Sequence, residues 1–344
     1  MRWSVVHAVA RATMRDFWRT PEAVFWSYAF PLGMALVLGF AFREQVRTPV
    51  PIAAVAAEDG TDTIAVLREA PRLQVEVLEP EAAERALTLG QVALIVHAGE
   101  DPLRLELDQT RPEAELAELL VRDRLQRGAG RRDAIPVATT AVTRPGSRYI
   151  DFLIPGLVGL NLLGMGMFGV GFNLVYMRVR RTLRRLAVTP MGRAEFFTGF
   201  ILMRLVLALP ASLVVVWFGQ LVFGVPMRGN WAWLTALIVA GGVCFSGIGT
   251  LLGSRAKTIE GASGWLNLVQ LPMWLLGGVF FSNQRFPGAL QTVVDAIPMS
   301  ILTDGLRGVM LEAEDLGAIA GPVLALLGLG VVCLAVAIRV FRWN

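Results

Sequence analysis

The stretch Arg178–Phe200, RVRRTLRRLAVTPMGRAEFFTGF, decides how the rest of the chain is read. It holds six arginines and one acid, Glu195, and it separates two long apolar runs, Ile150–Tyr176 and Ile201–Phe223. A cationic block beside apolar runs marks the cytoplasmic side of membrane spans. Its apolar residues recur at helical spacing up to a Thr-Pro pair, which predicts a short amphipathic helix, a break and a second helix. The arginines either only fix topology or form a surface for a cytoplasmic partner.

The composition places the chain in the integral membrane class. Of its 344 residues, 54% are hydrophobic and 17% are charged, and the mean hydropathy is +0.55. The formal net charge is +4, yet residues 43–148 hold 14 arginines and 18 acids. The basic clusters lie beside apolar runs without interleaved aromatics, which argues against a nucleic-acid partner. Cys244 and Cys333 fall in apolar runs and predict neither a disulfide nor a metal site.

Residues 1–20 predict an amphipathic helix at the membrane interface. Its apolar residues recur at spacings of three and four, and its arginines step by four along another face: Arg11, Arg15 and Arg19. Residues 21–42 follow as the first transmembrane span. This run is longer than the apolar core of a signal peptide, which is the rival interpretation of the N-terminus.

Residues 43–148 have the composition of a soluble α+β domain on the external side, inserted between the first and second spans. Alternating apolar residues predict four strands: Ile52–Ala57, Leu73–Leu78, Val92–Val96 and Leu103–Leu107. Helical periodicity predicts three helices: Asp62–Glu69, Glu81–Leu89 and Pro112–Gln126. For the last helix we expect an apolar face made of Leu116, Leu119, Leu120 and Leu125. Arg127–Thr143 predicts a flexible return linker.

Residues 149–344 predict five further spans, which makes an α-helical membrane protein with six spans and both termini in the cytoplasm. The fifth span covers Gly261–Phe281 and the sixth covers Ala318–Val340. Residues 282–317 are too polar to cross and too apolar for a free loop, so they predict a re-entrant or interfacial pair of helices on the outer side. Asp304 and Arg307, three residues apart, predict a structural ion pair on one helix face.

Two stretches resemble the ABC-2 type transporter permeases, the membrane subunits of ATP-binding cassette exporters. Residues 178–197 are similar to the family's cytoplasmic coupling helix, and Met177–Arg181 departs from the E-R-E-x-G that commonly precedes it. Pro272–Ser282, followed by Ile297–Gly308, is similar to the family's closing segment, and the inserted domain is placed as in members with a large external loop. The coupling residues that carry the resemblance are Thr182, Leu183, Leu186, Val188, Thr189, Pro190, Glu195, Phe196 and Phe197.

The resemblance implies that a separate ATP-binding cassette ATPase docks on residues 178–197 and that two permeases pair as a homodimer or heterodimer in membrane lipid. It also implies that ATP and Mg²⁺ act in the ATPase. The chain itself has no P-loop, because its single lysine, Lys257, lacks the preceding glycines of that motif. Neither HExxH nor GxSxG occurs. We therefore expect a transporter subunit that is not an enzyme and binds no metal or cofactor.

We expect an exporter of the bacterial cytoplasmic membrane that moves an amphipathic, drug-like or lipid-like substrate outward. Polar residues inside spans usually face protein or a cavity, which suggests a substrate path with these neighbours: Asn161, Met165, Phe168, Asn173, Asn267, Gln270 and Trp274. Hydrogen bonding between helices is the alternative role for these side chains. Arg204, inside the third span, either snorkels to the surface or contacts substrate. The rival function is a membrane-anchored receptor or assembly protein that uses its external domain to bind a ligand or partner.

Overall fold

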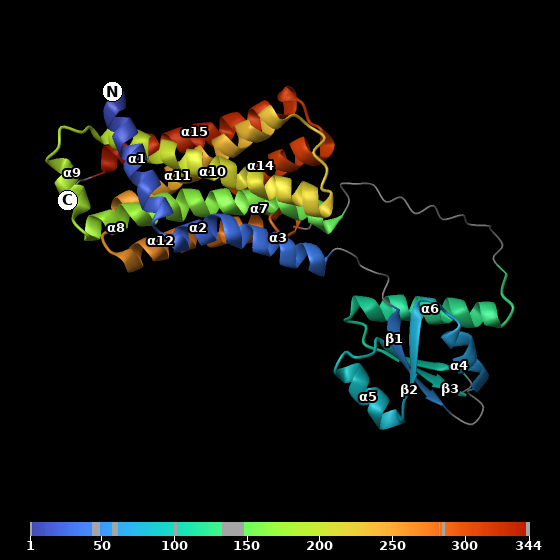
Figure 1. The fold of residues 1–344 in the computed structure, drawn as a ribbon. Coiled ribbons are helices and arrows are strands. Elements are labelled where there is room, and N and C mark those ends of the chain that lie inside the picture. Colours follow the sequence, from blue (N-terminus) through green and yellow to red (C-terminus); the bar gives the residue numbers. More distant parts are fainter. Residues whose placement is uncertain are drawn as a thin grey trace. The chain divides into compact units, whose positions relative to one another are not determined.

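The chain forms two compact units, which are drawn in Figure 1 and described separately here. The computed structural model describes residues 2–42, 49–56, 61–99, 102–132, 148–281, 283 and 286–341. One unit joins residues up to Arg43 with residues from Thr143 onward, and the other covers Glu44–Val142. The sequence predicts that the domain covers residues 43–148. Residue 43 and most of the predicted linker lie outside the described residues, and residue 148 is the first one described after the linker.

The first unit, hereafter the membrane unit, is entirely helical in the residues described. Its N-terminal part comprises α1 (Trp3–Trp18), α2 (Pro21–Val24), the π-helical turn η1 (Phe25–Ala29) and α3 (Phe30–Ala41). The central part comprises α7 (Tyr149–Gly166), η2 (Met167–Phe172), α8 (Asn173–Val179), α9 (Thr182–Ala187) and α10 (Arg193–Phe223). The remainder comprises α11 (Trp231–Arg255), α12 (Ile259–Leu276), α13 (Gly288–Asp295), α14 (Pro298–Arg307), η4 (Gly308–Glu312) and α15 (Leu316–Val340).

Five helical segments in the described residues are long and apolar enough to cross a membrane: Pro21–Ala41, Tyr149–Val179, Arg193–Phe223, Trp231–Arg255 and Leu316–Val340. They coincide with five of the six predicted spans, so the chain is an integral membrane helical protein. The predicted fifth span forms α12, which ends at Leu276 because Gly277 follows and the chain turns through the positive φ of Gly278. Glu260, Asn267 and Gln270 make α12 less apolar than the others, and its crossing stays a prediction.

Glycine allows the helices of the membrane unit to approach closely. Helix α11 packs along α15, and a Cβ atom added at Gly330 of α15 would lie 2.8 Å from the Cα of Cys244. On its other side α11 meets η2, where a Cβ added at Gly249 would lie 2.8 Å from the Cα of Met167. Real Cβ atoms do not come that close, so a side chain at either position forces the helices apart. The contact between α11 and its neighbours therefore depends on residues without side chains.

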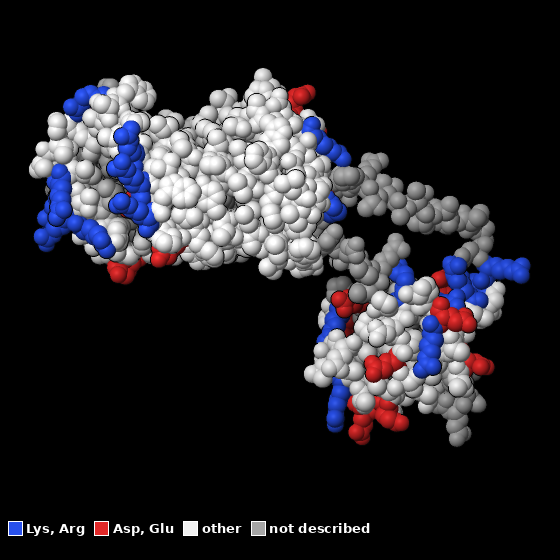
Figure 2. Space-filling model, viewed as in Figure 1, with Lys and Arg blue, Asp and Glu red and all other residues white. Residues whose placement is uncertain are grey.

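Charged side chains gather at the two ends of the membrane unit, with an uncharged belt between them on the face shown in Figure 2. At one end, hereafter the arginine-rich end, the ends of α8 and α11, helix α9 and the start of α10 bring together several cations (Figure 1): Arg178, Arg180, Arg181, Arg184, Arg185, Arg193, Arg255 and Lys257, with Arg2 paired to Glu195 beside them. At the opposite end carboxylates outnumber the described cations and include Asp151, Asp295, Asp304, Glu312, Glu314 and Asp315. The two ends thus differ in the sign of their charge.

The second unit, hereafter the α+β unit, is a four-stranded sheet with helices on both faces. Its strands β1 (Val50–Ala56), β2 (Leu73–Val77), β3 (Leu94–Ala98) and β4 (Arg104–Leu107) lie in the order β2-β1-β3-β4. Strand β1 is parallel to β2 and β3, and β4 is antiparallel to β3. Helices α4 (Thr61–Arg68) and α6 (Pro112–Gly128) pack against one face, and α5 (Pro80–Thr88) packs against the other. Successive residues of β1, Ile52 and Ala53, accordingly enter different clusters.

Helix α6 buries only part of the face that its leucines predict. Leu116 is 40% exposed and Leu119 is 61% exposed, whereas Ala114, Ala117 and Val121 are fully buried. The apolar residues of this segment lie on two faces of the helix, one with leucines and one with alanines and a valine. The small alanine side chains allow α6 to lie close to the sheet. The predicted packing was therefore wrong for Leu116 and Leu119, whereas Leu120 and Leu125 pack against the core as predicted.

Candidate functional site

The segment predicted to contact a partner forms a short helix, α9, at the arginine-rich end, between the end of α8 and the start of α10 (Figure 1). A small apolar cluster lies beneath it. Leu183 is fully buried there with Phe196 and Phe197 of α10 and with Phe341, and Leu186 is half-buried against the same cluster. Thr182, the first residue of α9, is also half-buried. The rings of Phe197 and Phe341 meet edge to face at 5.0 Å. These side chains therefore hold the segment in place and are not available to a partner.

The exposed part of the segment is its C-terminal turn, Val188–Pro190. The Val188 side chain is 87% exposed, and both Thr189 and Pro190 are exposed. The Thr189 hydroxyl donates to the carbonyl of Leu186 at 2.6 Å, which closes the helix and orients the turn. Arg184 and Arg185, on the last turn of α9, are exposed as well. We name residues 184–190 the tip.

Glu195, which the sequence analysis places among the coupling residues, is buried and bonded within the chain. Its carboxylate accepts hydrogen bonds from the backbone N–H of Gly192 at 3.1 Å and of Arg2 at 2.6 Å. The Arg2 guanidinium pairs with the same carboxylate at 3.3 Å and also donates to the carbonyl of Pro190. The Gly192 and Glu195 spacing is a helix-capping signal that the sequence carries. Nothing in the sequence indicates Arg2, 193 residues away, as the partner.

Arg178 fastens the other side of the segment. Its guanidinium donates to the carbonyls of Gly253 and Ser254, each at 3.1 Å, and to that of Ala256, so it caps the C-terminus of α11. Arg181 has φ 59°, in the left-handed region that favours glycine. This is the position at which the E-R-E-x-G pattern has its glycine. The segment is thus held by Arg178 before it and by Arg2 after it.

The predicted path residues of the second span differ in burial and in their contacts. Asn161 is buried, and its amide donates to the carbonyl of Ser27 in η1 at 3.2 Å. This contact is the hydrogen bond between helices that was the alternative role for the side chain. Met165 is buried in the main core of the membrane unit, and Phe168 is half-buried against that core. Asn173, the first residue of α8, is half-buried.

The three predicted path residues of α12 differ among themselves. The Asn267 side chain is exposed on the surface of the membrane unit. Gln270 and Trp274, one helical turn apart, are half-buried, and each has one fully buried polar atom without a hydrogen-bond partner: the Gln270 Oε1 and the Trp274 Nε1. The first accepts and the second donates hydrogen bonds. Together they offer an unsatisfied acceptor and donor on one side of α12.

Asp304 and Arg307 form the ion pair that their spacing predicts, at 3.1 Å. The Arg307 guanidinium lies 3.6 Å from the centre of the Phe152 ring and donates to the carbonyls of Phe152 and Gly278. Asp304 also accepts from the Asn283 amide at 3.3 Å. This network joins α14, α7 and the turn after α12 at the end opposite the tip.

Arg204 of α10 is more than nine-tenths buried, so it does not snorkel to the surface of this unit. Its Nε has no hydrogen-bond partner among the described residues, and its guanidinium lies 5.7 Å from the centre of the Phe200 ring. A Cβ added at Gly169 of η2 would lie 3.1 Å from its Nη1. Gly169 therefore makes room for the guanidinium between α10 and η2.

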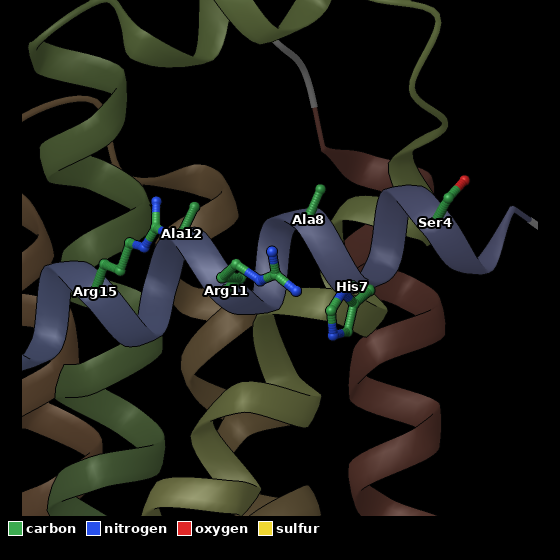
Figure 3. A pocket seen from close by; sticks show the side chains of 6 residues that line it. All are labelled: Ser4, His7, Ala8, Arg11, Ala12 and Arg15. Atoms are coloured by element: carbon green, nitrogen blue, oxygen red, sulfur yellow. The ribbon is translucent and has the colours of Figure 1, made fainter.

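Helix α1 presents a shallow, open depression on its outward face. Figure 3 shows the six lining side chains, Ser4, His7, Ala8, Arg11, Ala12 and Arg15, distributed along three turns of the helix. The opposite, apolar face, with Val6 and Phe17, is buried against the rest of the unit, where α1 packs along α10. Among the described residues, no group of three His, Cys, Asp or Glu side chains could hold a metal ion.

A family model described as ABC-2 family transporter protein matches residues 22–339, from α2 to the last turn of α15. The chain therefore belongs to the ABC-2 family of transporter proteins, as its coupling-type segment suggested. It is similar to the inner membrane transport permease YadH of Escherichia coli strain K12, at 26% identity over 171 residues. That match covers 49% of this chain and 66% of the permease, just under two thirds of its length. Another relative is ABC transporter G family member 20 of Dictyostelium discoideum, 26% identical over 184 residues, which are 52% of this chain and 25% of that protein. The family match places the chain among transporter proteins.

Proposed function

We propose that this chain is the permease subunit of an ATP-binding cassette exporter, energised by a separate ATPase that docks on the tip. The proposal rests on the family and on one structural observation: the tip is exposed although the segment that carries it is firmly anchored. Val188 is 87% exposed, whereas Leu183, Phe196 and Phe197 beneath it are buried. A docking element needs both properties, because a force applied to a loose loop would not reach the spans.

Three connections would carry movement of the tip into the helices. Arg178 ties the start of the segment to the C-terminus of α11. Arg2 ties its end to α1, which packs along α10. The Phe197 and Phe341 contact ties it to the residue that follows α15. The buried members of the predicted coupling set thus transmit the movement, while the exposed members make the contact.

The orientation follows from charge. The arginine-rich end faces the cytoplasm under the positive-inside rule, which puts both termini inside and the α+β unit outside, in the cytoplasmic membrane of a bacterium. Helix α12 completes six spans. Six spans are half of the membrane unit implied by the family resemblance, so two permeases pair as a homodimer or heterodimer. ATP and Mg²⁺ act in the ATPase, since this chain lacks the P-loop motif.

Gln270 and Trp274 are the best-supported substrate contacts. A buried acceptor and a buried donor without partners are destabilising unless something satisfies them, and an amphipathic, drug-like or lipid-like substrate with a hydroxyl or amide group would do so. Asn267, exposed on the same helix, would then face the second permease or the substrate. Asn161 is assigned to helix packing, because its amide is already bonded to Ser27.

The membrane-anchored receptor or assembly protein is the second candidate. One observation favours it: the α+β unit has its own core and exposes Leu116 and Leu119 on α6. In that case a partner or ligand binds the α+β unit, and the tip is not needed for function.

The two candidates are separated by changing the tip without disturbing the fold. In Val188→Asp a charge replaces an exposed apolar side chain, so we expect normal expression and folding but about 100-fold weaker ATPase association. The matched control is Leu119→Asp, the same chemistry at an exposed position of the α+β unit. Tagged chains are purified in mild detergent from the native host, and the retained subunit is identified by mass spectrometry and by ATP hydrolysis. If the natural chain retains no ATPase while its membrane complex is intact, the exporter proposal is wrong.

A further inference from the structure

The segment that contains the tip carries an unusual balance of charge. Residues 180–193 contain five arginines, Arg180, Arg181, Arg184, Arg185 and Arg193, and no acid. Met177 and Val179, which precede this stretch beside Arg178, add no acid to it. The nearest acid after the tip, Glu195, is buried and already paired with Arg2. Nothing on the segment itself therefore neutralises its exposed cations.

The exposed arginines also have no partner elsewhere in the described part of the chain. No carboxylate there lies within ion-pair distance of Arg181, Arg184 or Arg185, and all three are exposed. Arg180 differs, because its guanidinium lies 4.4 Å from the centre of the Tyr176 ring. Arg178 differs too, because it caps α11. The cations left for an outside partner are those on and beside α9.

We propose that the ATPase subunit meets this chain through an acidic groove, in which carboxylates face Arg181, Arg184 and Arg185 around an apolar recess for Val188. This inference rests on the proposed function and adds the chemistry of the partner. Guanidinium groups favour carboxylates because they offer paired N–H donors. Charge complementarity at the rim of an interface mainly raises the association rate and selects the partner. An ATPase with a neutral or basic groove is then rejected by this permease.

The test measures how the affinity for the ATPase depends on salt and on charge. The ATP-hydrolysing subunit recovered with the natural chain is purified, and its binding is measured in phosphatidylcholine nanodiscs from 50 to 500 mM NaCl. We expect about tenfold weaker binding across that range, and about 100-fold weaker binding of Arg184→Glu/Arg185→Glu at 50 mM. The matched control, Arg11→Glu/Arg15→Glu, makes the same charge change on α1. Acidic residues of the ATPase that cross-link to the natural tip are then changed to lysine. These lysine substitutions are expected to restore binding to the Arg184→Glu/Arg185→Glu variant.

The outcomes separate the two proposals. If the natural chain retains no ATPase at 50 mM NaCl, the proposed function fails and the acidic groove fails with it. If the ATPase binds but neither salt nor Arg184→Glu/Arg185→Glu changes its affinity, only the acidic groove is overturned. Equal losses with the α1 control would show a general charge effect and would also overturn it. So would a loss seen only when the nanodiscs contain phosphatidylglycerol, because the arginines would then bind lipid.

Discussion

The membrane unit and the α+β unit solve the packing problem in opposite ways. In the membrane unit, helices meet where side chains are missing, as at Gly330 against Cys244 and at Gly249 against Met167. In the α+β unit, the sheet is filled by side chains such as Ile52, Leu94 and Val121, all fully buried. The reason is the solvent: burying an apolar side chain gains little when the alternative is lipid, so close backbone contact decides. The difference teaches that the same substitution has opposite consequences in the two units.

Gly330→Val gives the largest expected effect. The added Cβ would meet the backbone of Cys244 at 2.8 Å, which separates α15 from α11. We expect a loss of about 3 kcal/mol or more, at the upper end of overpacking costs because the obstacle is backbone. The measurement is thermal unfolding in detergent, followed by size-exclusion chromatography. Gly328→Val, on the same helix, is the control, because a Cβ there meets nothing within 4 Å. Equal stability of the two variants would show that α11 and α15 are not held by this contact.

Arg181→Gly is expected to have a smaller effect than Gly330→Val and to stabilise the membrane unit. Arg181 has φ 59°, which glycine adopts without strain. We expect the membrane unit to gain about 1 kcal/mol from relief of that strain, although a cation is lost beside the tip. Thermal unfolding of the whole chain measures the gain, and Arg184→Gly is the control because its position is helical. A gain with Arg184→Gly, or a loss with Arg181→Gly, would contradict the strained conformation.

The smallest effect concerns a surface charge of the α+β unit. A hydrogen bond from Arg127 lowers the pKa of Asp123 below its usual range, with Arg131 also nearby. A lowered pKa in the folded state adds stability at pH values above the unfolded pKa, and that stability is lost as the pH falls through the folded pKa. Asp123→Asn should therefore weaken α6 slightly at pH 7, and by less as the pH falls through the lowered pKa of Asp123. Hydrogen exchange of α6 in the full chain, corrected for the intrinsic pH dependence, measures this; a difference that does not shrink as the pH falls would point to another cause.

Much of the architecture could be predicted because composition and periodicity act locally. Runs of apolar residues predict five of the helices that can cross a membrane, and alternation predicts each strand of the α+β unit to within a few residues. The family was recognisable from the coupling-type segment and is confirmed by the match over residues 22–339. Whether α12 crosses the membrane is harder to predict, since its polar residues reduce the apolar signal on which such predictions depend.

The candidate site was predictable as a segment and not as a set of contacts. The order of residues in 178–197 predicts a coupling element, but it does not distinguish Leu183, which is buried, from Val188, which is exposed. Both are apolar residues on or beside one short helix. Only the position of α10 and Phe341 decides which of them is covered.

The sequence by itself determined that this chain enters a membrane, where its helices and strands form, and which segment carries the cationic tip, because these properties depend on neighbouring residues. The tertiary structure alone decided that Arg2 pairs with Glu195, that Asn161 bonds to Ser27, and that α6 buries its alanines while exposing two leucines. Each of these contacts joins residues distant in the chain. The sequence around each residue allows several such partners, and the packing of whole helices selects one of them.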